Sequence, residues 1–216
     1  MMDKHYLTSL FTPGSVIVLA GDADAPESQT PQARALLEAL KAQKFTGSLQ
    51  FFDINTSGTL ADLAQIRADL AIIAQPNKDL PAALEIAGRM NCRSALVLSN
   101  GVDAALAEQL HKIARREGMH LLGPNSLGIQ RPSLQLNASA AGPLAHEGSL
   151  ALVCQSGALT ASILDWASNN GVGFSSVISL GPHTDMGLSE ALDFLANDAR
   201  TQSIVVYMEG IQDARR

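Results

Sequence analysis

The sequence contains little of what marks an extracellular, metal-binding or membrane protein. Aromatic residues make up 4% of its 216 residues, and its two cysteines are Cys92 and Cys154. Their spacing fits neither a disulfide framework nor a zinc site, so we expect reduced thiols, no metal and a cytoplasmic location. No apolar run is long enough for a membrane span or a signal peptide, so a membrane is not expected as a partner.

Positive charge is also scarce. The 15 lysines and arginines stand against 21 aspartates and glutamates, which gives a formal net charge of −6. A field of that sign repels nucleic acid and anionic membranes, so neither is expected as a partner. An anionic ligand would need a local site built from backbone amides and helix ends.

The loop after the first apolar run lacks the glycines of an ordinary dinucleotide site. Its only glycine is Gly21, which lies among Asp22, Asp24 and Glu27. In G-x-G-x-x-G the glycines let the backbone approach a diphosphate, and carboxylates at these positions would repel it. The loop therefore disfavours an NAD site, and a solvated acidic loop is the alternative.

Short apolar runs alternate with helical patterns up to residue 125. Strands that are continuously apolar, each followed by a helix, predict a parallel sheet covered on both faces. With right-handed crossovers this is a doubly wound, Rossmann-like α/β fold. The predicted strands are 15–20, 48–54, 70–75, 94–100 and 120–125, and the predicted helices are 30–43, 60–67, 80–90 and 103–117.

The pattern breaks at 126–147, where Gly, Pro and Ser recur without a period and predict a connector. A second run follows, with strands at 150–155, 174–180 and 203–209 and helices at 157–169 and 187–197. We therefore expect a Rossmann-like domain over 1–145 and a truncated flavodoxin-like α/β domain over 146–216. An open sheet edge and exposed apolar faces in a truncated domain favour a homo-oligomer.

The stretch LALVCQSGALTASILDWA, residues 150–167, places a serine where a buried strand meets a helix. One interpretation makes Ser156 a nucleophile, but Cys154 and Ala158 occupy the glycine positions of G-x-S-x-G. The other makes Gln155, Ser156 and Gly157 an anion cradle beside the unpaired amides of a helix start. The residues favour the anion cradle, and a plain helix cap is the structural alternative.

Two further loops follow predicted strands, where ligands of open α/β sheets bind. Gly123 and Pro124 predict a turn, in which Asn125 tolerates unusual dihedral angles and offers an amide to a ligand. In SLGPHTDMG, His183 and Asp185 lie at a strand end, either as catalytic groups or as ordinary surface residues.

Together these loops resemble the NDP-forming acyl-CoA synthetases, relatives of the succinyl-CoA synthetase alpha subunit. The resemblance rests on LLGPNSLGI at 121–129, LNAS at 136–139, GSLALVCQSGALTASILDWA at 148–167, GFSSVISLG at 173–181 and VVYMEGIQDARR at 205–216. LNAS and DARR look closest to bacterial proteins in which this module is fused to a GNAT domain, and which act as protein lysine acetyltransferases.

The resemblance implies a CoA-binding Rossmann domain followed by the first part of a succinyl-CoA-ligase-like flavodoxin domain. CoA or acyl-CoA, a small-molecule thioester, is the implied ligand. From the resemblance we expect the C-terminal ligase part with its phosphohistidine, the ATP-grasp part and any GNAT domain to lie outside this sequence. ATP or ADP would therefore act only through absent parts, and no residue here is assigned a catalytic role.

The same resemblance assigns binding residues. Near CoA it implies Gly21, Asp22, Ala74, Gln75, Pro76, Gly123, Pro124 and Asn125, and at a phosphate it implies Gln155, Ser156 and Gly157. Lys78, just past the third predicted strand, is the nearby basic residue that we nominate as a substitute for the family's lysine. The acidic first loop and the lack of a lysine at 53–60 depart from the family, so we expect weak, salt-sensitive CoA binding. The alternative is a degenerate regulatory or scaffolding module with little CoA affinity.

Overall fold

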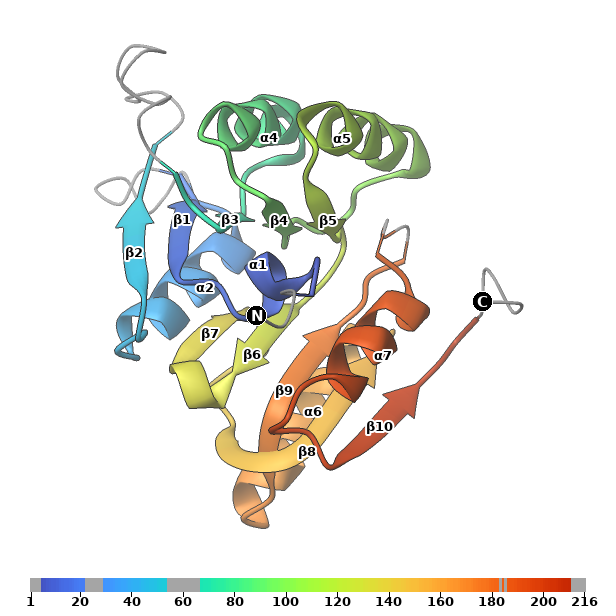
Figure 1. Ribbon diagram of the computed structural model, residues 1–216. Coiled ribbons are helices and arrows are strands. Elements are labelled where there is room, and N and C mark those ends of the chain that lie inside the picture. The colour runs from blue at the N-terminus through green and yellow to red at the C-terminus, as the bar shows by residue number, and fades with distance from the viewer. Residues whose placement is uncertain (1–4, 22–28, 54–66, 183, 185, 211–216) are drawn as a thin grey trace.

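The computed structural model describes residues 5–21, 29–53, 67–182, 184 and 186–210, which form two five-stranded sheets (Figure 1). All neighbours in the first sheet are parallel, in the order β2-β1-β3-β4-β5. Its strands are β1 (Ser15–Leu19), β2 (Ser48–Phe51), β3 (Leu70–Ile73), β4 (Ser94–Val97) and β5 (His120–Leu122). The expected doubly wound parallel sheet is confirmed.

Two helices of this half, α2 and α5, begin at side-chain caps that the sequence supplies. Thr30 accepts a hydrogen bond from Ala33 N–H at the start of α2, and Asp103 does the same for Leu106 at the start of α5. Gly118, at φ +70°, ends α5. The helices are α1 (Thr8–Phe11), α2 (Pro31–Lys41), α4 (Leu80–Arg89) after the 3-10 turn η2 (Asn77–Asp79), and α5 (Ala104–Glu117). Apart from Arg67, the helix predicted at 60–67 lies outside the described residues.

The second sheet has the order β10-β8-β9-β6-β7. β8, β9 and β10 are mutually parallel, whereas β6 runs antiparallel to both β7 and β9. The strands are β6 (Gly128–Arg131), β7 (Leu136–Ser139), β8 (His146–Cys154), β9 (Gly173–Ser179) and β10 (Ser203–Tyr207), with the 3-10 turn η3 (Pro132–Leu134) between β6 and β7. Of the helices, α6 (Gly157–Asn169) has the predicted bounds and α7 is Leu188–Ala196.

The connector predicted at 126–147 is wrong, because it contains the β6–β7 hairpin and the start of β8. Every residue of β6 and β7 is buried, so these strands show no alternation of apolar and polar residues that would betray them. The second sheet therefore begins with β6 at residue 128, earlier in the chain than the predicted domain boundary at 145. That domain boundary remains a prediction.

Buried polar side chains of this hairpin, including those of LNAS, fasten the following loop. Gln130 Nε2 donates to Ser139 Oγ (3.1 Å) and to Pro143 O (3.0 Å), while its Oε1 accepts from Ala145 N–H (2.9 Å). Asn137 Nδ2 donates to Gly142 O at 2.9 Å. LNAS thus has a structural role here, since each polar group is buried with a partner.

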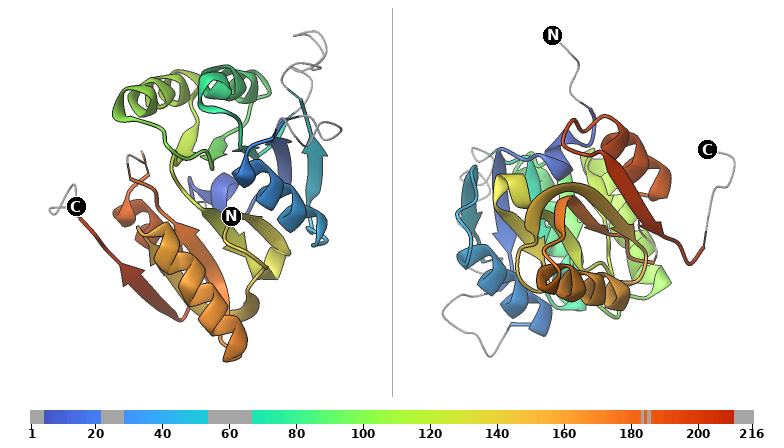
Figure 2. Two further views of the ribbon diagram at one scale, coloured as in Figure 1. Left: turned by 180° about the vertical axis from the view of Figure 1, so that it is seen from behind. Right: turned by 90° about the horizontal axis from the view of Figure 1, so that it is seen from below.

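Three hydrophobic clusters divide the molecule into layers (Figures 1 and 2). The helices α4 and α5 cover one face of the first sheet, and α6 covers the outer face of the second. Between the sheets, α1, α2 and α7 join the inner faces of both in one cluster. Because one core spans both halves, their relative placement is fixed by apolar burial.

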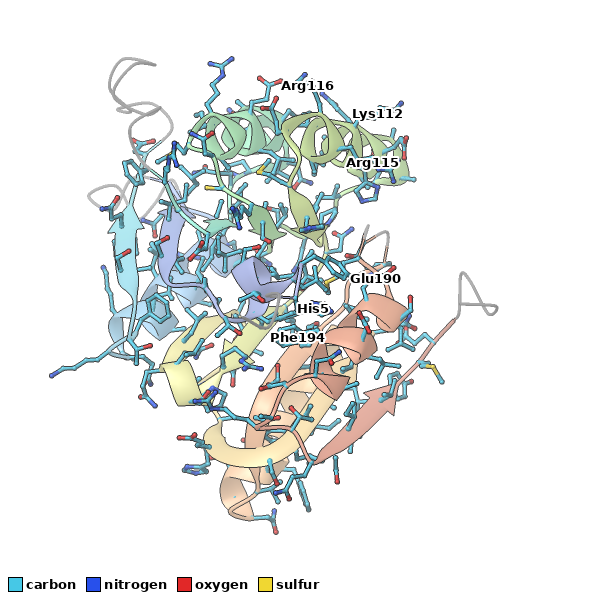
Figure 3. All side chains as sticks on the ribbon, viewed as in Figure 1. His5, Lys112, Arg115, Arg116, Glu190 and Phe194 are labelled. Atoms are coloured by element: carbon cyan, nitrogen blue, oxygen red, sulfur yellow. The ribbon has the colours of Figure 1, made fainter. Side chains whose placement is uncertain are left out.

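Phe194 on α7 lies at the centre of the junction between the halves (Figure 3). Its ring centroid lies 4.6 Å from the ring centroid of Phe11 and 5.5 Å from that of His5. The guanidinium carbon of Arg131 lies 5.6 Å from the Phe194 ring centroid. Arg131 Nη1 also donates to Asp198 Oδ2 at 2.7 Å, with both side chains buried. Within the described part of the chain, no helix has the length and apolar character needed to cross a membrane.

Candidate functional site

The carboxyl ends of the strands in the two sheets form one continuous row of loops, which we call the ledge: residues 19–21, 73–76, 98–102, 123–127, 154–157, 179–181 and 207–210. In the first sheet, hydrogen bonds join successive strand ends: Ala74 N–H to Leu19 O (2.9 Å), Leu98 N–H to Ile73 O (2.9 Å) and Asn125 N–H to Ser99 O (3.0 Å). Ligands of open α/β sheets bind at such ends.

The row continues without a break into the second sheet. Ser126 Oγ donates to Ser179 O, at the end of β9. From there, Leu180 N–H donates to Cys154 O (2.8 Å), and Gln155 N–H donates to Tyr207 O (3.1 Å) at the end of β10. A ligand lying along the first sheet would therefore reach the loops of the second.

The Gly123-Pro124-Asn125 turn is the joint between the two sheets. Gly123 has φ +89°, its peptide bond to Pro124 is cis, and Asn125 has φ +59°. The Asn125 side chain accepts from Val102 N–H (3.0 Å) and donates to Val102 O (2.8 Å). The sequence predicts that this amide faces a ligand, whereas in the structure it bonds to Val102 in the loop after β4. A direct contact with CoA remains a prediction.

The loop after β9 packs directly against this turn. Gly123 N–H donates to Thr184 Oγ1 (3.2 Å), and Met186 N–H donates to Leu121 O (3.3 Å). A Cβ at Gly181 would collide with the carbonyl oxygen of Pro124 and the backbone of Asn125. His183 and Asp185 lie outside the described residues.

Ser156 caps α6, because its Oγ accepts from Leu159 N–H at 3.4 Å. No imidazole contacts this oxygen among the described residues, so nothing there activates it as a nucleophile. At Gly157 a Cβ would lie 3.1 Å from Leu127 Cγ, which brings the helix start against the segment that follows Asn125. The two predicted binding loops are thus neighbours.

Gln155 has a role that the sequence did not reveal. Its Oε1 accepts from Glu209 N–H (2.6 Å) and Gly210 N–H (3.0 Å), and its Nε2 donates to Gly210 O (3.0 Å). The amide therefore ties the turn after β10 to the start of α6. An anion here would meet the first backbone amides of the helix, whose dipole favours negative charge.

Of the described residues predicted beside CoA, all lie along the ledge except Lys78, which is exposed in η2 just beyond it. Gly21, at φ +82°, follows β1, while Asp22 lies outside the described residues. Ala74 and Gln75 are buried after β3, followed by Pro76. Gln75 Nε2 has no hydrogen-bond partner within the described part of the chain. A buried donor left unpaired is costly, so a ligand acceptor would satisfy it.

Both cysteines are buried free thiols. Burial, together with the charge of Asp69, raises the pKa of Cys92 from 9.0 to about 12. Cys154 Sγ donates to Ser156 O at 3.1 Å. A thiol held protonated is a poor nucleophile and a poor metal ligand. Across residues 5–21, 29–53, 67–182, 184 and 186–210, no cluster of His, Cys, Asp or Glu could hold a metal.

The structure is an α/β protein with a doubly wound parallel sheet whose strand-end loops, where ligands of such folds bind, join those of a second α/β sheet. Known proteins narrow this class. Residues 147–216 match the family described as the succinyl-CoA ligase like flavodoxin domain.

Several relatives are ADP-forming CoA ligases. The chain is 40% identical over 154 residues to acetate–CoA ligase (ADP-forming) I of Archaeoglobus fulgidus. The aligned residues make up 68% of this chain and 22% of that ligase. It is 30% identical over 223 residues to the alpha subunit of acetate–CoA ligase (ADP-forming) I of Pyrococcus furiosus, covering 97% of this chain and 48% of that subunit.

The structure agrees with these sequence matches. It matches the apo dinucleotide-forming acetyl-coenzyme A synthetase 1 of Ca. Korarchaeum cryptofilum with a TM-score of 0.84 and 27% identity, covering 97% of this chain and 47% of that one. These matches support the family of NDP-forming acetyl-CoA synthetases, on the alpha-subunit side. The expected likeness to GNAT-fused acetyltransferases finds no support in them. The chain spans about half the length, or less, of these relatives.

Proposed function

We propose that this chain is the CoA-binding part of an NDP-forming acyl-CoA synthetase-like protein, and that CoA or acyl-CoA lies along the ledge. The observation that carries the proposal is the contact between the turn at Gly123-Pro124-Asn125 and the loops of the second sheet. With CoA on the ledge, its thiol end at this turn would lie beside the proposed phosphate site at Gly157, whose Cβ position is 3.1 Å from Leu127 Cγ. An acyl group passing between a phosphate and a thiol needs both sites within reach.

Each stretch of the ledge has a task in this proposal. The diphosphate approaches Gly21, and the adenine lies near Ala74-Gln75-Pro76, where the unpaired Gln75 Nε2 offers a donor. Lys78, exposed just past β3, supplies the nearby positive charge. At the other end, the thiol points toward the turn at Asn125.

The helix start at Gly157 would hold a phosphoryl group through backbone amides and the helix dipole. ATP or ADP chemistry belongs to parts of the longer relatives outside this chain. Incubation of the chain with ATP, CoA and acetate is therefore expected to yield no acyl-CoA. The open edge at β10, with Val205 and Tyr207 exposed, supports the proposal of a homo-oligomer, which light scattering would test.

Calorimetric titration with CoA tests the proposal. Asp22 and Asp24 in the first loop each cost on the order of 0.5–1 kcal/mol near a phosphate, so together they weaken CoA binding roughly tenfold. We expect weak, salt-sensitive binding that Asp22→Ser strengthens. Tight binding that ignores Asp22→Ser would contradict this role of the loop.

A regulatory or scaffolding module with little CoA affinity is the second candidate. It is favoured because two side-chain amides predicted to contact ligands already form hydrogen bonds within the chain. Asn125 bonds to the backbone of Val102, and Gln155 bonds to the backbone at 209–210. If the same titration shows no heat with CoA at any concentration while the chain remains folded, this candidate replaces the first.

A further inference from the structure

Asn100 and Gly101 form an asparagine–glycine pair on the ledge, in the loop between β4 and α5. Such pairs are chemically labile, because glycine lacks the side chain that shields its backbone nitrogen from the neighbouring asparagine. Asn100 is exposed, and Gly101 has φ +69° with open space around it. Within the described part of the chain, neither the Asn100 carboxamide nor the Gly101 N–H has a hydrogen-bond partner.

The chain contains a second such pair, which serves as an internal comparison. Asn170 and Gly171 follow α6, and Gly171 has nearly the same φ, +67°, with equally open space. Here, however, Asn170 Nδ2 donates to Trp166 O at 2.7 Å, and its backbone N–H donates to Trp166 O and Ala167 O. These bonds hold the carboxamide along the helix and away from the nitrogen of Gly171.

We propose that Asn100 is a site of spontaneous deamidation, and that Asn170 is protected by its place at the end of α6. The Gly101 backbone nitrogen attacks Cγ of Asn100 and loses its proton, and a C–N bond closes a five-membered succinimide. The side-chain nitrogen leaves as ammonia with that proton. Water then opens the ring at either carbonyl, giving aspartate or isoaspartate at position 100 with no oxidant or reductant.

The product would change the ledge where its two sheets join. The loop at 99–102 is held by Asn77 Nδ2 on Gly101 O (3.1 Å) and by the two bonds between Asn125 and Val102. Isoaspartate adds one backbone atom between Ser99, whose carbonyl accepts from Asn125 N–H, and Gly101. That insertion shifts Gly101 and Val102 relative to Asn77 and Asn125. Both products also place a new negative charge on the ledge. If CoA binds there, as the proposed function holds, its affinity should fall roughly fivefold, the effect of one surface charge.

Ageing the whole chain at mildly alkaline pH, followed by peptide mass spectrometry, tests the modification without reference to CoA. We expect conversion of Asn100 while Asn170 stays intact, and equal conversion of both in urea, where the fold no longer protects either. Equal rates in the folded chain, or faster conversion of Asn170, would overturn the proposal.

The consequence is tested by CoA titration of fresh wild type, of Asn100→Asp and of Asn100→Gln. The glutamine variant keeps the amide but cannot form a five-membered ring, so its own CoA affinity, measured fresh and after ageing, should stay constant while that of wild type falls. If Asn100→Asp binds as tightly as fresh wild type, the effect on the ledge is wrong. If fresh wild type shows no CoA binding, the proposed function fails, while the mass spectra still decide the modification.

Discussion

Replacement of Asn125 separates two roles for its side chain: holding the loop after β4, or contacting a ligand. The structure gives it two hydrogen bonds to Val102, of 3.0 and 2.8 Å, and a left-handed backbone at φ +59°. Each bond contributes about 0.5–1.5 kcal/mol net, and alanine in this conformation costs about 1–2 kcal/mol. Asn125→Ala should therefore lower the free energy of unfolding by about 2–5 kcal/mol.

Asn125→Gly is the matched control, since glycine loses the same hydrogen bonds but tolerates the positive φ. It should destabilise the chain by about 1–3 kcal/mol, mainly through the lost bonds. Urea denaturation, compared at equal slope, measures both values.

CoA titration of the same two variants completes the test. If the amide acts by holding the loop, affinity falls in both variants together with stability. The reasoning would be refuted by an Asn125→Ala protein that keeps wild-type stability and loses CoA binding, because that pattern identifies a ligand contact.

Three further predictions concern packing, charge and thiol chemistry. Gly181→Ala should lower the free energy of unfolding by about 1–3 kcal/mol and weaken CoA binding, because the new Cβ collides with the turn at Pro124. Gly210→Ala, whose Cβ meets open space, should change neither stability nor binding. Arg131→Met leaves the buried Asp198 carboxylate without its ion-pair partner, so the free energy of unfolding in urea should fall by about 3–5 kcal/mol. The double variant with Asp198→Asn should recover much of that stability, because it removes the unpaired charge. Cys92, with its pKa raised to about 12, should resist thiol reagents at mildly alkaline pH until the chain unfolds. Because the folded pKa lies above the unfolded value of 9.0, stability should decline as the pH rises beyond that value. Rapid labelling of the folded chain would count against this prediction.

The first sheet could be predicted because its strands and helices carry strong local signals. The strand β3 is apolar throughout, and β1 and β4 are apolar after a first serine. Asp103 and Gly118 mark the two ends of α5. The hairpin β6–β7 could not, because its buried polar residues are satisfied by partners that no periodicity reveals. Gln130, for example, is fully buried but bonds to Ser139, Pro143 and Ala145.

The candidate site was likewise predictable only in part: its loops could be located from the sequence, but the hydrogen-bond partners of its side chains could not. The rule that ligands lie at strand ends located its loops, and Gly123 and Ser156 mark two of them in the sequence. The partners of side-chain amides stayed hidden, because a carboxamide can bind either a ligand or a nearby backbone. Asn125 and Gln155 are both such cases, and tertiary contacts alone decided their hydrogen bonds.

Hydrogen exchange of the backbone with and without CoA tests the central claim most directly, namely that the strand ends of both sheets form one CoA-binding ledge. We predict that CoA slows exchange in both halves at once: at 74–76 and 99–102 in the first, and at 123–127 and 155–157 along the junction with the second. Slowing confined to one sheet, or no change at saturating CoA, would contradict the claim.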